Sequence, residues 1–105
     1  MLEVYSLTSD FPKEELYGLT SQIRRAAVSV SSNIAEGFVR LGDLDKRRFY
    51  YTALGSLTEL QNQLLIAKDL GYLSSEGFKR IAEETVRLAK MLNRLIKIIS
   101  TKDNC

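Results

Sequence analysis

The residues from Leu19 to Arg40 constrain the fold more than any other stretch of the chain. Apolar residues recur there at helical spacing, so the stretch is predicted to form one helix. One face would carry Leu19, Ile23, Ala26, Val30, Ile34, Gly37 and Leu41. Val28, Ala35 and Val39 make a second side apolar, and the polar strip is confined to Arg25, Ser29, Ser32, Glu36 and Arg40. A helix that is apolar on two sides needs two sets of neighbours, and we expect other copies of the chain to supply the second.

Length and composition predict one globular domain over residues 1–105. The chain has 105 residues, of which 45% are hydrophobic and 27% charged, enough for one core. Cys105 is the only cysteine and the last residue, so we expect no internal disulfide, as suits a reducing cytosol. No apolar run approaches the roughly 18 residues of a membrane span, and the start lacks a signal-peptide pattern. We therefore expect a cytoplasmic protein without a membrane partner.

Two more long helices are expected after Gly42. Asp43 is the expected N-cap of a helix that runs to about Leu70, where Gly71 would end it. Its bundle seam would be Tyr50, Ala53, Leu57, Leu60, Leu64 and Ala67. Either Ser74 or Ser75 caps a last helix that continues to about Ser100. No segment alternates with a period of two, so the class is all-α with antiparallel neighbours.

The beginning of the chain is expected to be less regular. Residues 1–8 can form only two helical turns, which are not stable unless they dock on something. Pro12 suits the first position of a helix, and Gly18 predicts a break before the long helix. Further along, Gly37, Gly55 and Ser56 are small residues inside helices, and we expect them to allow a close approach of neighbouring helices.

Several motifs between residues 11 and 73 resemble one known family. They are Phe11-Pro12-Lys13-Glu14-Glu15, the run from Tyr17 to Ala27, Ser32-Asn33-Ile34-Ala35-Glu36-Gly37, Arg48-Phe49, Ala53-Leu54-Gly55-Ser56, Glu59-Leu60 and Leu70-Gly71-Tyr72-Leu73. In order and spacing they resemble the small four-helix-bundle proteins encoded within intervening sequences of bacterial 23S ribosomal RNA genes. The chain is also similar to the accessory variability protein of diversity-generating retroelements, which works beside a reverse transcriptase.

This resemblance implies an up-down antiparallel four-helix bundle that assembles as a homopentamer. It also implies a role with RNA or DNA, and a reverse transcriptase as an alternative partner. Family members usually have a full first helix, whereas here only its last two turns precede residue 9. Either the true start lies upstream or this copy has a shortened first helix.

The residue types argue against catalysis, cofactors and metal sites. The chain has no histidine and no internal cysteine, which removes the commonest general base and thiol nucleophile. Glu36 and Glu59 lack the accompanying Glu-x-x-His spacing of a di-metal bundle. We expect them instead in a structural polar layer that fixes register and assembly. Its members are Arg25, Asn33, Glu36, Ser56 and Glu59, with Ser29 and Gln63 beside them.

Basic residues form two candidate nucleic-acid contacts. Near the turn at residue 42 they lie next to aromatic residues 49–51, a combination that can hold a single strand. The first set is Arg24, Arg40, Lys46, Arg47 and Arg48, and the second is Arg87, Lys90, Arg94 and Lys97. The alternative for the first set is that Asp43 and Asp45 neutralise the turn while the aromatics pack inward. The alternative for the second is an ordinary solvated helix face, so a structural oligomer without nucleic acid also remains open.

Overall fold

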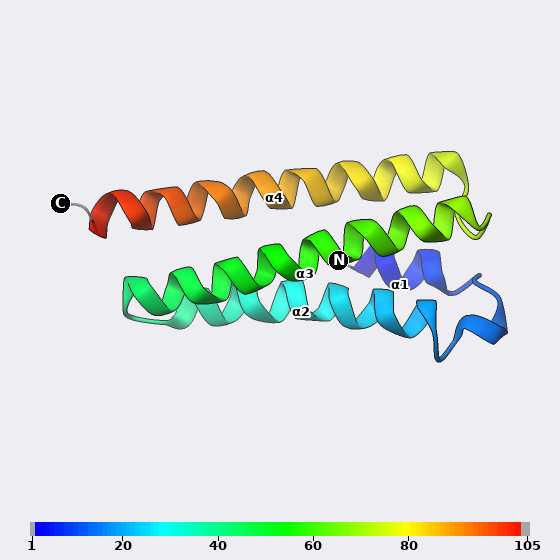
Figure 1. Cartoon of the computed structure of the whole chain (residues 1–105), viewed down its shortest axis with the longest axis horizontal. Helices are drawn as coiled ribbons and strands as arrows, with labels where there is room; N and C mark the ends of the chain where they lie inside the picture. The colour runs from blue at the N-terminus through cyan, green and yellow to red at the C-terminus, as the bar shows by residue number, and fades with distance from the viewer. Residues whose placement is uncertain (1, 104–105) are drawn as a thin grey trace.

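The computed structural model describes residues 2–103. The elements in chain order are α1 (Leu2–Thr8), a 3-10 turn η1 (Lys13–Glu15), α2 (Leu19–Val39), α3 (Asp43–Asp69) and α4 (Ser75–Asp103). Residues 2–103 contain no strand, which confirms the all-α class. The helices run alternately up and down, and α3 lies between α2 and α4 (Figure 1). Met1 and Cys105 fall outside the described residues. The expectations about the start of the chain and about the single terminal cysteine are therefore not tested.

The seam predicted on α3 is confirmed, and it forms the middle of the core. All six seam residues, from Tyr50 to Ala67, are at most 3% exposed. Because α3 packs against both α2 and α4, its seam meets Ile23 and Val30 on one side and Ile81 and Leu92 on the other. These four side chains are fully buried. The elongated helical bundle therefore has one continuous core.

The predicted core face of α2 is confirmed up to its last member. Ile34 is half-buried and the five residues of the face at 19, 23, 26, 30 and 37 are buried. Leu41 was expected to continue the face, and this is wrong, because α2 ends at Val39 and the extended backbone of Arg40 turns the chain away. Leu41 is fully exposed. Val28 and Val39 are also exposed, so the second apolar side of α2 has no cover within one chain.

The turn between α2 and α3 is held by a lysine. The Nζ atom of Lys46 donates hydrogen bonds to the carbonyl oxygens of Gly37 and Phe38, both at 3.0 Å. A cation is favourable there because the last helical carbonyls carry partial negative charge. The N-cap expected at Asp43 is wrong by one residue. Gly42 occupies that position without a side-chain cap, and Asp43 is the first helical residue.

The turn between α3 and α4 follows the sequence prediction closely. Gly71 has a φ of +84°, which suits glycine, and its N–H bonds the carbonyl of Lys68. The N–H of Tyr72 bonds the carbonyl of Ala67, which completes the Schellman pattern. Of the two candidate caps, Ser74 is the one used, since its Oγ accepts from the N–H of Gly77 at 3.0 Å. The last helix extends three residues beyond the expected Ser100.

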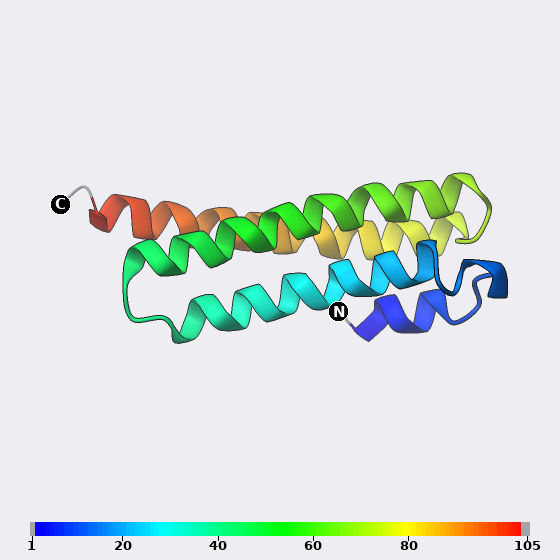
Figure 2. The same ribbon diagram turned by 60° about the horizontal axis from the view of Figure 1, so that its bottom comes forward.

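The first helix is short and docks at one end of the bundle. At 1.5 Å per residue α1 spans roughly 10 Å, against about 31 Å for α2. Val4 is fully buried, and the Nε of Arg24 donates to Thr8 Oγ1 at 2.9 Å. Figure 2 shows α1 beside the first turns of α2 only. Within residues 2–103, α1 therefore covers only this end of α2.

The small residues inside helices have different roles. Gly37 lies against the ring of Tyr50, and a Cβ at position 37 would overlap that ring, which confirms the expected close approach. At Gly55 no helix of the same chain makes the expected close approach, because a Cβ there would meet nothing within 4 Å. Ser56 approaches α2 through a hydrogen bond with Ser29.

Candidate nucleic-acid interface and polar layer

The turn between α2 and α3 gathers four of the predicted basic residues, and other groups of the protein contact all four of them. Arg40 donates to Glu36 Oε2 at 2.8 Å, and its guanidinium lies 4.7 Å from the centre of the Phe49 ring. Lys46 is held by the carbonyls at the end of α2. Arg47 is half-buried, whereas the side chain of Arg48 is 76% exposed. Its Nη1 lies 3.9 Å from Asp45 Oδ1, which is a long ion pair. Arg48 therefore offers the most accessible charge of the turn.

The three aromatic residues of this region face different ways. Tyr50 is buried in the core, packs edge-on against Phe38 at 6.1 Å between ring centres, and has a pKa raised by burial. Phe49 lies under Arg40, and Tyr51 is exposed. Of the three, only Tyr51 presents an open ring on which a base could stack.

An apolar tip surrounds the basic turn and was missed by the sequence reasoning. We define it as Phe38, Val39, Leu41 and Leu44, which are between 56% and 100% exposed. The available signal was the number of large apolar residues on both sides of the turn glycine. Such a concentration of exposed apolar surface is typical of an interface.

Arg24 does not belong to the turn. It lies 16 residues before Arg40 on α2, about 24 Å away along the helix. Its guanidinium sits 5.0 Å from the centre of the Tyr5 ring and bonds Thr8. The structure therefore gives Arg24 a contact that holds α1 in place.

The second basic set forms a stripe on α4. Arg87, Lys90, Arg94 and Lys97 are all exposed and project from one side of the helix. Residues 85–102 contain five basic side chains and no acidic one, so positive charge is concentrated in this part of the sequence. The role of the α4 stripe and of the α2–α3 turn in binding nucleic acid stays a prediction.

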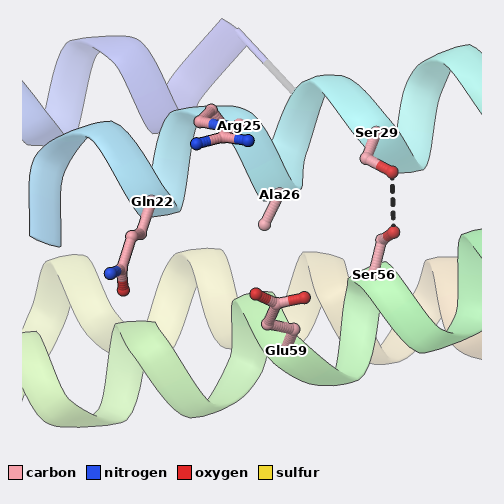
Figure 3. Close-up of a pocket in the computed structure, with 6 residues that line it drawn as sticks. All are labelled: Gln22, Arg25, Ala26, Ser29, Ser56 and Glu59. Carbon is pink, nitrogen blue, oxygen red and sulfur yellow. Dashed lines mark hydrogen bonds between the residues drawn. The ribbon is translucent and has the colours of Figure 1, made fainter.

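Residues of the polar layer line a pocket of about 400 Å³ between α2 and α3 (Figure 3). Ser29 and Ser56 share a hydrogen bond of 2.7 Å across the two helices. Asn33 Nδ2 extends this network by donating to the carbonyl and the Oγ of Ser29, at 2.8 and 3.2 Å. Asn33, Ser29 and Ser56 are thus one hydrogen-bonded unit.

The charged members of the layer do not pair with one another. Arg25 and Glu59 line the same pocket from opposite helices, but both are exposed and no ion pair joins them within residues 2–103. Glu36 bonds Arg40, four residues further along the same helix. The role of this layer in assembly therefore stays a prediction, because one chain leaves the layer open to solvent.

A buried glutamine belongs to this region and was underestimated from the sequence. Gln63 is 6% exposed, and its Nε2 donates to Glu59 Oε1 at 3.3 Å while its Oε1 has no partner. Its spacing of four from Glu59 and seven from Ser56 was the available signal. A buried carbonyl oxygen without a hydrogen-bond donor lowers the free energy of unfolding. A donor that reached Gln63 Oε1 would therefore stabilise this end of the layer.

One carboxyl group between helices has a perturbed pKa. Burial raises the pKa of Glu84 on α4, and a hydrogen bond and like charge from Glu3 on α1 raise it further. Arg87 opposes this shift. The pair lies where α1 docks on α4, far from the polar layer, and does not form a catalytic constellation.

The described part of the chain shows no metal centre or membrane span. No cluster of three or more His, Cys, Asp or Glu side chains occurs among the residues described. Likewise, no helix within that part is long and apolar enough to cross a bilayer. The class defined by fold and surface is thus an antiparallel helical bundle with a basic turn, a basic stripe and a polar layer between two helices.

Comparison with protein families agrees with the motifs in the sequence. The chain belongs to the 23S rRNA-intervening sequence protein family, whose model matches residues 1–94. A comparison with curated proteins gave no match. The matched region includes α1, α2, α3 and most of α4, so it contains the turn, the polar layer and the start of the basic stripe.

Proposed function

We propose that this protein is a non-enzymatic bundle that assembles with copies of itself, as a pentamer by its resemblance, and binds RNA or DNA. The observation that supports self-assembly is the exposure of large apolar side chains. Fifteen large hydrophobic residues among those described are exposed, including the whole apolar tip. A local concentration of exposed apolar side chains, such as the apolar tip, is typical of a protein–protein interface.

Charge and repetition support nucleic-acid binding. One chain has a formal charge of only +2, which is too small to hold a polyanion strongly. Five copies carry +10 and repeat the basic turn and the α4 stripe around the assembly. Repeated weak contacts to one strand raise the overall affinity well above that of a single patch.

Two other functions are kept as alternatives. An adaptor for a reverse transcriptase would use the same basic surface on an enzyme-bound nucleic acid. A purely structural oligomer would bind no polyanion, and its basic residues would only solvate the surface. Glu36 is engaged by Arg40, so a metal held between Glu36 and Glu59 is less favoured, and metal analysis of the purified protein would test it.

Two measurements test the proposal. Light scattering at micromolar concentration should give several times the mass of one chain, and a folded particle of one chain would refute self-assembly. Filter binding of single-stranded RNA and DNA should weaken steeply as salt increases. Arg48→Ala should weaken binding, whereas Lys13→Ala, an exposed cation at the other end of the bundle, should not. No binding at low salt would leave the structural oligomer.

A further inference from the structure

The pocket between α2 and α3 has the size of a small-molecule site. Its volume of about 400 Å³ falls within the usual range for ligand pockets, roughly 300–1,000 Å³. We call it the α2–α3 pocket. Every residue that lines it except Ala26 is polar, as Figure 3 shows: Gln22, Arg25 and Ser29 from α2, and Ser56 and Glu59 from α3.

The α2–α3 pocket lies away from α1. Arg24 is the residue through which α2 hydrogen-bonds Thr8 of α1. Gln22 and Ala26 lie about 160° around α2 from Arg24, since each residue turns an α-helix by about 100°. The pocket is therefore formed by α2 and α3 alone, and α1 contributes no residue to its lining.

The two helices bring opposite charges to this pocket without pairing them. Within residues 2–103, the side chain of Arg25 makes no hydrogen bond or ion pair, and the carboxylate of Glu59 accepts only from Gln63. Figure 3 shows the carboxylate of Glu59 extending from α3 toward α2, while the guanidinium of Arg25 stays on the α2 side. A positive and a negative group therefore border one polar space and remain separate.

An unsatisfied acceptor lies beside Glu59. The Nε2 of Gln63 donates to Glu59 Oε1 at 3.3 Å, and the Oε1 of the same amide is buried without a donor. Because Glu59 is exposed, a modest rotation of its side chain would admit a ligand donor to both acceptors. A guanidinium group suits them, because it is planar, carries several N–H donors and can bind a carboxylate through two of them.

Arg25 determines what the other end of the ligand carries. A ligand that is only a cation would be attracted by Glu59 and repelled by Arg25, and a simple anion would meet the opposite conflict. A molecule with a cation at one end and a carboxylate at the other is attracted at both ends. The carboxylate can accept two N–H bonds from the guanidinium of Arg25.

We propose that the α2–α3 pocket binds a small dipolar molecule that has a guanidinium group at one end and a carboxylate at the other. Its guanidinium binds Glu59 and Gln63, and its carboxylate binds Arg25. Gln63 also positions Glu59 through the hydrogen bond between them. This site is separate from the basic turn and from the α4 stripe, and it depends neither on nucleic acid nor on assembly.

The test compares one dipolar probe with its two halves on the full chain. The probe is 4-guanidinobutanoate, and the halves are butylguanidinium and butanoate. Ligand-observed NMR titration, which works for one chain and for an oligomer alike, should show the probe binding at least tenfold more tightly than either half. No binding of the probe up to about 10 mM, or equal affinity for the probe and a half, would overturn the proposal.

Matched variants assign the two ends of the probe. Glu59→Gln should weaken the probe and butylguanidinium at least tenfold each. Arg25→Gln should weaken the probe at least tenfold but should not weaken butylguanidinium, because it removes a repulsive charge. The controls Lys79→Gln and Glu83→Gln make the same charge changes at exposed positions of α4 and should leave the probe unaffected. The circular dichroism spectrum should stay unchanged in all four variants.

Two results would give the pocket another role. If the probe does not bind and Glu59→Gln lowers the mass of the oligomer, a second copy of the chain fills the pocket, which refutes the small ligand. If the control variants weaken the probe as much as Glu59→Gln and Arg25→Gln do, the probe follows overall charge, which also refutes this site.

Discussion

Replacing Gly37 by alanine tests the packing of α2 on α3 most directly. The added Cβ would overlap the ring of Tyr50, which is buried and has Phe38 edge-on beside it, so the ring cannot turn away freely. Overpacking of a core costs about 1–3 kcal/mol, and we take the upper half of that range. Alanine returns about 1 kcal/mol through its higher helix propensity. The net loss of unfolding free energy should be about 1–2 kcal/mol.

The assay is thermal unfolding followed by circular dichroism at fixed protein concentration, because assembly makes Tm depend on concentration. For a domain of this size, about 1–2 kcal/mol lowers Tm by roughly 4–15 °C. Gly55→Ala is the matched control, since its Cβ meets nothing within 4 Å. This control should raise stability by up to about 1 kcal/mol.

A double variant then identifies the contact. In the background Tyr50→Ala, the change Gly37→Ala should no longer destabilise, because the ring that it overlaps is absent. A Gly37→Ala protein as stable as the parent would refute the close approach of α2 and α3 at this position. So would equal destabilisation by Gly37→Ala with and without the Tyr50 ring.

Three further predictions follow from single contacts. Ser29→Ala and Ser56→Ala should show a coupling of about 0.5–1.5 kcal/mol in a double-mutant cycle of urea unfolding, and additive effects would contradict the hydrogen bond. Lys46→Met should cost about 1 kcal/mol by freeing the last carbonyls of α2, whereas Arg48→Met should cost much less. Glu84→Gln should raise Tm at pH 7, because a folded-state pKa above the unfolded value means that stability is lost as pH rises through it. The advantage should shrink as the pH is lowered toward the unfolded pKa and Glu84 of the parent becomes protonated, and a constant difference across pH would contradict the Glu3–Glu84 pair.

Features that depend on local sequence were predicted well. The α3 seam follows from helical periodicity, and the turn at Gly71 follows from a backbone conformation that favours glycine. The family was also recognisable from motifs alone. The first two predictions succeeded because they depend on residues close together along the chain, and the family was recognised because several motifs between residues 11 and 73 keep their order and spacing.

Predictions that needed the position of a second element were less successful. Leu41 was placed on the core face because periodicity does not show where Lys46 and the extended Arg40 end the helix. Gly55 was assigned a close neighbour that α3 does not have there. Glu36 was expected to face another helix, but Arg40, one turn away, competes for its carboxylate. An ion pair within one helix can form without any tertiary contact, and the sequence alone does not show whether it is preferred to a pair between two helices.

The contacts near residues 11–15 have a consequence for how the molecule opens. Phe11 packs against Tyr72 with ring centres 5.5 Å apart, and the Tyr72 hydroxyl donates to Glu15 Oε2 at 3.0 Å. These links tie the loop before α2 to the turn after α3. The opposite end has no such tie from α1, so amide hydrogens near the last turns of α4 should exchange first. Local unfolding of the bundle should therefore start at the end far from α1, while the contacts at the α1 end keep the helices together.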